Sequence, residues 1–209
     1  MSTSMTTPGL FVVFEGGDGV GKSTQVLELV TRLHNRGVRT ETTRQPGGTR
    51  IGAELRRLLL DPDHPELTAR TEALVYAADK AQHVEEVIRP ALARGDVVVC
   101  DRYVDSMIAY QGAGRVLDLT EVEQLARWAT GGLQPDLTVL LDADPAEAVA
   151  NIQQQDRLEA AGLGFHRRAR DHFLRLAGED PGRYLLLGAR DAREGIAEKV
   201  EETVLALLG

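Results

Sequence analysis

The chain has 209 residues, one cysteine and a formal net charge of -8. This length suits one domain, the lone Cys100 excludes a disulfide framework, and no apolar run approaches the ~18 residues that a membrane span needs. We therefore expect a cytoplasmic protein without a membrane partner. The acidic balance argues against a nucleic-acid partner, which would favour a basic face, yet it permits a locally positive pocket for a small phosphorylated molecule.

Apolar runs along the chain predict five strands. Residues 1–9 are polar, and we expect them to form a disordered lead-in to a single domain over residues 10–209. Short, nearly continuous apolar runs are typical of strands buried on both faces of a parallel sheet. They occur at residues 10–15, 96–100, 137–141 and 184–187, and a weaker strand is expected at 38–43.

Segments with helical spacing separate these strands. Residues 21–36 have an apolar stripe, and residues 66–94 predict a long helix that Pro90 kinks or splits. Alternating strands and helices predict a three-layer α/β fold with a mainly parallel five-stranded sheet. Residues 151–164 are polar and then punctuated by glycine, so we expect a mobile flap there. Capping-box spacing predicts later helix starts at Thr120, Asp144 and Asp191.

A glycine-rich loop directly follows the first predicted strand and fits the pattern G-x-x-x-x-G-K-S/T. Its glycines allow successive backbone N–H groups to wrap a phosphate, and the next helix directs its positive end at the anion. Lys22 is expected to reach the β- and γ-phosphate oxygens, Ser23 to bind Mg²⁺ and Thr24 to touch the α-phosphate. The alternative is a glycine-rich turn with a surface lysine. The residues are Gly16, Gly17, Asp18, Gly19, Val20, Gly21, Lys22, Ser23 and Thr24.

Seven further motifs follow this loop. They are TRQPGGT at 43–49, RTEAL at 70–74, YAADKAQHV at 76–84, IRPAL at 88–92, DRYVDS at 101–106, AYQG at 109–112 and PDLT at 135–138. In this order the motifs resemble the thymidylate kinases of bacterial type, enzymes that phosphorylate dTMP with ATP. The resemblance runs from about Leu10 to the C-terminus. It implies a P-loop nucleoside monophosphate kinase fold for one kinase domain, ATP and Mg²⁺ as cofactors, dTMP as substrate, and a homodimer.

The resemblance also assigns residues to the phosphates and the sugar of dTMP. Asp101 and Arg102 end the third predicted strand, at the sheet edge where open α/β folds bind ligands. Asp101 is expected in the Mg²⁺ shell, Arg102 and Arg56 at the acceptor phosphate, and Asp18 at the acceptor sugar. Arg44 precedes the tight turn at Pro46, which is expected to aim it inward toward the substrate. The alternative for Asp101 and Arg102 is a strand-end salt bridge. The alternative for Arg56 is an exposed helix arginine beside Arg57, and that for Asp18 is a solvated turn aspartate.

For the base, the resemblance implies that Tyr76 stacks on thymine and that Lys80, where the family usually has arginine, contacts it. On composition alone, Tyr76 is better interpreted as a core residue at helical spacing. Gln45 replaces the family's usual glutamate, so a salt bridge expected there is in doubt. The remaining substrate-binding residues are Ser106, Tyr110 and Gln111.

The predicted flap departs most from the family. Gln153–Gln155 stand where basic residues are expected, and only Arg157 keeps the pattern, so our hypothesis is that Arg157 swings over the transferred phosphoryl group beside Lys22. Reserve candidates are Arg167, Arg168 and Arg170. Two alternative functions stay open, a kinase of another nucleoside monophosphate and a non-catalytic nucleotide-binding protein. The five histidines lack metal-ligand spacing, so we read them as surface or packing residues.

Overall fold

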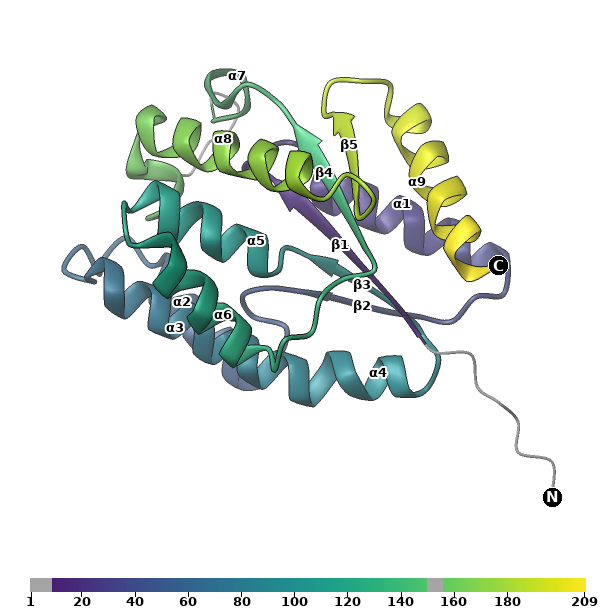
Figure 1. Cartoon of the computed structure of the whole chain (residues 1–209), viewed down its shortest axis with the longest axis horizontal. Helices are drawn as coiled ribbons and strands as arrows, with labels where there is room; N and C mark the ends of the chain where they lie inside the picture. Colours follow the sequence, from purple (N-terminus) through teal and green to yellow (C-terminus); the bar gives the residue numbers. More distant parts are fainter. Residues whose placement is uncertain (1–8, 150–155) are drawn as a thin grey trace.

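The computed structural model describes residues 9–149 and 156–209, which form a five-stranded, wholly parallel sheet with helices on both faces (Figure 1). The order across the sheet is β2-β3-β1-β4-β5. All five predicted strands are confirmed, and the predicted lead-in, apart from Gly9, lies outside the described residues. The strands are β1 Leu10–Gly16, β2 Thr40–Arg44, β3 Val97–Asp101, β4 Leu137–Asp142 and β5 Tyr184–Gly188.

Two helices cover one face of the sheet, and other helices cover the opposite face. α1 and α9 pack together over a core that includes Leu29, Leu33 and Val204, which agrees with the predicted three-layer fold. No helix in the described ranges is long and apolar enough to cross a membrane. The α-helices are α1 Lys22–Asn35, α2 Arg50–Leu60, α3 Ala69–His83, α4 Arg89–Ala93, α5 Val104–Met107, α6 Leu119–Ala129, α7 Pro145–Val149, α8 Leu163–Glu179 and α9 Arg193–Leu208.

The long helix predicted over 66–94 is interrupted just before Pro90. A π-helical turn, η1 Val84–Ile88, separates α3 from α4, and Pro90 lies in the first turn of α4. Proline has no N–H to donate and its ring crowds the carbonyl four residues earlier, here that of Glu86 in the π-helical turn, so the interruption lies where Pro90 is expected to disturb the helix. A second π-helical segment, η2 Ile108–Gly114, continues α5.

Two of the three predicted helix starts are wrong. The carboxylate of Asp118, not the hydroxyl of Thr120, caps α6 by accepting from the Glu121 amide at 3.0 Å. α9 begins at Arg193 without a side-chain cap, so Asp191 is not its N-cap. Asp144 does accept from the Ala146 amide at 2.8 Å, and Pro145 is the first residue of α7.

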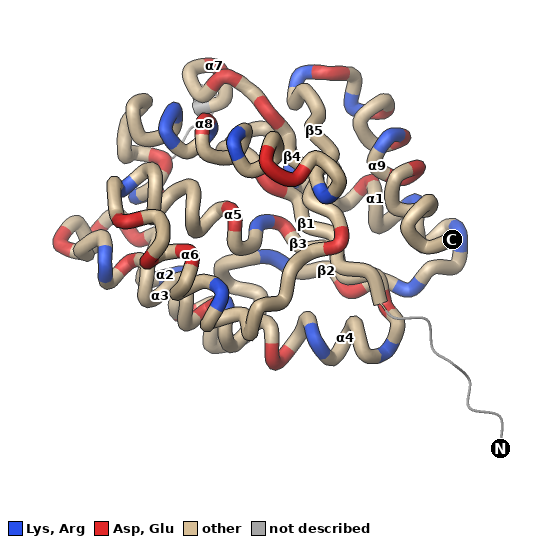
Figure 2. The backbone as a smooth tube through the Cα atoms, in the orientation of Figure 1, with Lys and Arg blue, Asp and Glu red and all other residues tan. Residues whose placement is uncertain are grey.

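The strand register brings the carboxyl ends of the central strands together. Phe14 pairs with Asp101, Gly16 pairs with Leu141, and Arg44 pairs with Asp101. Residues that follow β1, β2 and β3 therefore meet at one edge of the sheet, where open α/β folds place their ligands. Along the described backbone, basic and acidic residues are interspersed (Figure 2).

Candidate active site

The glycine-rich loop joins β1 to α1 and depends on glycine at a close approach of two strands. Gly16 has φ 129°, and a Cβ atom there would lie 2.2 Å from the carbonyl oxygen of Leu141. Gly19 and Gly21 also have positive φ values, of 72° and 92°. No side chain caps α1 and its first turn has no acidic residue, so its amides are free to face an anion.

Lys22 lies buried under this loop. Its ammonium donates to the carbonyl oxygens of Gly16 at 3.2 Å and Gly17 at 2.5 Å. Burial, followed by the charge of Arg102, lowers the pKa of Lys22 to about 8, although Asp18 and Asp101 oppose this shift. A phosphate would supply the negative charge that the buried ammonium needs.

Two oxygen ligands suited to a magnesium ion meet beside the loop. The Ser23 hydroxyl donates to Oδ2 of Asp101 at 2.7 Å, across the gap between α1 and the end of β3. Mg²⁺ prefers hard oxygen ligands and usually takes only one or two protein groups, with waters and substrate phosphates completing its shell. This pair fits that donor set. The described residues hold no group of three or more His, Cys, Asp or Glu side chains that could bind a metal ion.

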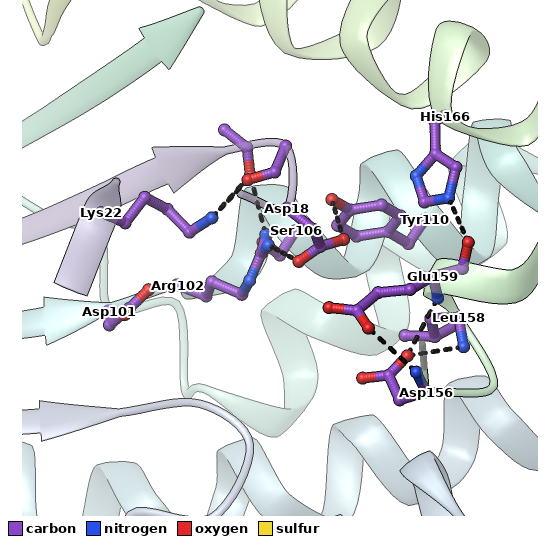
Figure 3. A network of polar contacts seen from close by, with 12 residues as sticks. Asp18, Lys22, Asp101, Arg102, Ser106, Tyr110, Asp156, Leu158, Glu159 and His166 are labelled. Carbon is purple, nitrogen blue, oxygen red and sulfur yellow. Dashed lines mark hydrogen bonds and ion pairs between the residues drawn. The ribbon is translucent and has the colours of Figure 1, made fainter. Parts of the chain in front are cut away.

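Arg102 occupies the centre of the site (Figure 3). Its guanidinium donates to the carbonyl oxygen of Gly16 and to the hydroxyl of Ser106, each at 2.9 Å, and pairs with Asp18. Asp18 also accepts from the Tyr110 hydroxyl at 3.2 Å. Burial opposes the ionisation of Asp18, but the charges of Arg102 and Lys22 outweigh burial and hold the pKa of Asp18 below its usual value.

A cavity extends from Arg102 away from the loop. Tyr76 and Lys80 of α3 lie on one side, four residues apart on the same helix face, as predicted. Tyr76 is also buried among core residues, which confirms its interpretation as a core residue, while its stacking on thymine stays a prediction. The cavity is lined by Asp18, Gln45, Pro46, Arg56, Leu60, Tyr76, Lys80, Arg102, Ser106, Met107, Tyr110, Gln111, Asp156 and Leu158.

The comparison with known proteins now decides the family. A family model described as thymidylate kinase matches residues 14–200. The chain belongs to the thymidylate kinase family. It is 57% identical over 200 residues to the thymidylate kinase of Cutibacterium acnes, with 96% of this chain and 98% of that one covered. It is 50% identical over 204 residues to that of Clavibacter michiganensis, with 96% of each chain covered. It is likewise 50% identical over 203 residues to that of Desulforudis audaxviator, covering 96% and 92%.

Two of the residues that depart from the expected family pattern, Gln45 and Lys80, contact each other. The Lys80 ammonium donates to Oε1 of Gln45 and to the carbonyl oxygen of Tyr103, both at 2.8 Å. Nε2 of Gln45 lies 2.7 Å from Nδ1 of His83, whose Nε2 lies 2.6 Å from the Thr43 hydroxyl. A buried hydrogen-bonded chain thus replaces the doubtful salt bridge.

Arg56 and Arg44, both predicted to bind the substrate, have different positions. Arg56 lines the cavity and donates to the carbonyl oxygen of Pro46 at 3.0 Å. Arg44 is exposed and is not among the residues that line the cavity, although its charge helps to lower the pKa of Arg56 after burial, so its contact with the substrate stays a prediction. Successive residues of a strand point to opposite faces, and Gln45 takes the inward position.

The structure places the guanidinium of Arg157 away from the loop. It pairs with Glu72 and donates to the carbonyl oxygen of Leu59 at 2.9 Å. Of the reserve candidates, Arg170 pairs with Asp142 beside the loop, Arg168 bonds the carbonyls of Ala113 and Gly114, and Arg167 is exposed. Gln153–Gln155 and the start of the predicted flap lie outside the described residues, and residues 163–164 belong to α8.

Three residues of this site were not among the predicted site residues. Glu15, completely buried, accepts from the Ser106 hydroxyl at 2.6 Å and from the amides of Tyr103 and Ser106. His166 lies beside Tyr110, and its Nε2 is 3.1 Å from the carbonyl oxygen of Glu159 (Figure 3). Glu72 binds Gln111 at 2.9 Å. Glu72 stands within the RTEAL motif and Glu15 directly precedes the loop, but burial of a carboxylate leaves no mark in one sequence.

Proposed function

We propose that this protein transfers the γ-phosphoryl group of ATP to dTMP, giving ADP and dTDP. The observation that carries the proposal is the position of Arg102. Its guanidinium bonds the carbonyl oxygen of Gly16 in the phosphate-binding loop and also lines the cavity that contains Tyr76. The cation of Arg102 thus lies between the donor site and the acceptor pocket, on the path that the transferred phosphoryl group would take.

On the donor side, the loop amides and the N-terminus of α1 would bind the phosphate chain. Lys22 would exchange its bonds to the Gly16 and Gly17 carbonyls for phosphate oxygens. Ser23 and Asp101 would hold Mg²⁺, which supplies charge neutralisation when bound. A second cavity, next to Gly19 and Thr24, suits the donor nucleoside; it includes Ala189, Arg190 and Asp191 of the turn after β5.

On the acceptor side, Arg102 and Arg56 would hold the phosphate of dTMP. A guanidinium can bind two oxygens of a phosphate through two parallel N–H bonds, which fixes the orientation of the phosphate and neutralises part of its charge. Asp18 and Tyr110 would contact a sugar hydroxyl, because their bonded oxygen atoms face the cavity between Arg102 and the base-binding side chains. The acceptor phosphate is already a dianion, so no general base is required, and positioning with charge neutralisation would account for most of the catalysis.

The base would lie against the ring of Tyr76. Nε2 of Gln111 is bonded to Glu72, and within the described residues its Oε1 has no hydrogen-bond partner, so it can accept from a base N–H. An ammonium has three N–H donors, and Lys80 uses two of them on Gln45 and Tyr103. The third would donate to a base carbonyl, which favours thymine over a base with an amino group at that position.

Release of ADP from ATP, measured with and without dTMP and then with other nucleoside monophosphates, tests this function. We expect dTMP to stimulate release far more than the other monophosphates do. Stronger stimulation by another monophosphate would support the alternative kinase. Nucleotide binding without any acceptor-dependent release would support the non-catalytic alternative.

We also propose a homodimer formed through α3 and α6. Leu74 on α3 is 58% exposed, and it borders an apolar groove with Leu117, Val122 and Leu125. A second copy seated there would remove this surface from water. Light scattering after size-exclusion chromatography tests it: wild type should have twice the chain mass, whereas Leu74→Asp should shift toward the monomer. A monomeric wild type would contradict the dimer.

A further inference from the structure

A short segment after the undescribed residues covers part of the acceptor cavity. Asp156 and Leu158 both line that cavity, and Leu158 is buried in the same cluster as Tyr76 and Met107. Asp156 organises the segment, since its Oδ1 accepts from the amides of Leu158 at 2.8 Å and Glu159 at 2.9 Å (Figure 3). We call residues 156–161 the cover segment; it ends with the 3₁₀ turn η3 Glu159–Ala161.

The residue between those two cavity-lining neighbours points the other way. Arg157 is anchored by three bonds: its amide donates to the carbonyl oxygen of Leu60 at 3.3 Å, its Nε to that of Leu59, and its Nη2 to Glu72. The side chain of Arg157 is only 10% exposed, and that of Glu72 is fully buried. All of these partners belong to α2 and α3, which wall the cavity.

Glu72 joins this anchor to the cavity itself. Besides Arg157, its carboxylate accepts from Nε2 of Gln111 at 2.9 Å and from Arg115 at 3.1 and 3.2 Å. One buried carboxylate therefore fixes the cover segment, the end of η2 and a cavity-lining amide. Loss of Glu72 would therefore release all three, whereas loss of Arg157 would release the cover segment and leave the buried Glu72 with fewer charge partners, which is unfavourable.

We propose that the ion pair between Glu72 and Arg157 positions the cover segment and Gln111 around the acceptor nucleotide. Arg157 is then a positioning residue for acceptor binding, in place of the phosphoryl-group contact that its sequence motif suggested. This inference rests on the proposed function, because it needs dTMP as the acceptor. Its physical basis is preorganisation: a wall already held in place costs less free energy to order when the nucleotide binds.

The variant Arg157→Ala separates the two roles. As a positioning residue, its loss should raise the dissociation constant of dTMP by about tenfold and leave the turnover at saturating dTMP within about threefold of wild type. ATP affinity should not change. As a contact to the transferred phosphoryl group, its loss should instead cut turnover at least about tenfold with dTMP affinity unchanged. Calorimetric titration of each nucleotide and steady-state kinetics measure these quantities.

A second variant and a structural readout make the test independent of activity. Glu72→Gln keeps the shape but not the charge, so it should weaken dTMP binding in the same direction, and Arg157→Lys should recover part of the affinity. Hydrogen exchange at the amides of Arg157, Leu158 and Glu159 should accelerate in Arg157→Ala. The control is Arg175→Ala, which removes an exposed pair with Glu179 on α8 and should leave all values unchanged.

Two different failures can be distinguished. If wild type neither binds nor phosphorylates dTMP, the proposed function is wrong. If wild type does both, while Arg157→Ala keeps wild-type dTMP affinity and slow exchange in the cover segment, the positioning role is wrong and the proposed function stands.

Discussion

The guanidinium of Arg102 donates a hydrogen bond to the carboxylate of Asp18, which lies 84 residues earlier in the chain. The pair joins the phosphate-binding loop to the end of β3, and it lies at the junction between the loop and the acceptor cavity. Both side chains are mostly buried, so their charges act on each other with little screening by water. The same guanidinium can therefore organise the loop before substrate binds and meet the acceptor phosphate afterwards.

Replacement of Arg102 by lysine should damage acceptor use more than donor binding. Lysine keeps the charge but has one ammonium where arginine has a planar fork, and Arg102 already contacts Gly16, Ser106 and Asp18 with that fork. We expect kcat/KM for dTMP to fall about a hundredfold, equivalent to about 3 kcal/mol. Kinetics with dTMP varied at saturating ATP would measure this.

The matched control for that experiment is Arg94→Lys. Arg94 is a half-exposed arginine that pairs with Asp96 and Glu41 at the opposite end of β3. Since exposed ion pairs contribute little, kcat/KM should stay near the wild-type value. An equal loss in both variants would mean that the Arg102 effect is not specific to the site.

ATP affinity should decrease as the pH rises through about 8. The buried ammonium of Lys22 has a pKa lowered to about 8, and phosphate binds the charged form. Below this pH the free protein already carries the proton, so affinity is nearly constant. Above it, binding must take up a proton, so the dissociation constant should rise toward tenfold per pH unit.

Calorimetric titrations of ATP between pH 6.5 and 9.5 would test the Lys22 prediction. The variant Lys22→Arg keeps its charge throughout this range, so its affinity should show a flatter profile even if it is weaker overall. A wild-type profile as flat as that of the variant would rule out titration of Lys22.

Acid should destabilise the protein through His83. This side chain is fully buried, and burial lowers its pKa from 6.5 to about 4. Between these values the unfolded chain binds the proton more readily than the folded one, so the free energy of unfolding falls as pH decreases. The full loss from this group is up to about 3 kcal/mol.

Urea unfolding at a series of pH values from 7 to 4 would measure that loss. His83→Gln removes the titrating group, so its stability should depend less steeply on pH, whereas the exposed His34→Gln should keep the wild-type slope. Burial likewise lowers the pKa of His172 to about 4, and this contribution is common to all three proteins. Identical slopes in wild type and His83→Gln would contradict the assignment.

The ring of Tyr76 should matter more than its hydroxyl. The side chain is 6% exposed, and it belongs both to the core and to the cavity wall. Tyr76→Phe should retain dTMP affinity within about threefold, because stacking needs only the ring. Tyr76→Ala should lose binding and about 3 kcal/mol or more of stability through the cavity left in the core. Equal binding by Ala and Phe variants in folded protein would exclude stacking.

Features that depend on contiguous residues could be predicted from the sequence. Four apolar runs and one weaker segment identified the five strands, and the loop from Gly16 to Thr24 has its expected place between β1 and α1. Both depend on local pattern: a doubly buried strand must be apolar throughout, and a phosphate-binding turn needs glycine at fixed positions. Tyr76, Arg102 and Gln111, which the motifs identified, all line one cavity.

Features that depend on distant partners could not be predicted. Arg157 and Glu72 are 85 residues apart, and nothing in either motif indicates that they pair. Arg44 and Gln45 are adjacent, and which of the two side chains faces the cavity depends on the register of the strand, which the sequence does not give. The start of α6 failed for another reason, because Asp118 and Thr120 are both good caps and the choice depends on how the helix packs.

The sheet order has a consequence for biosynthesis. β1 is the first strand to leave the ribosome, yet its neighbours are β3 and β4, so one of its edges stays unpaired until Asp142 has been made. Sequence-distant parallel pairing is slow, and an exposed strand edge invites association with other chains. The nascent protein is thus most vulnerable to aggregation during translation of its first two-thirds, when chaperone binding would protect it most.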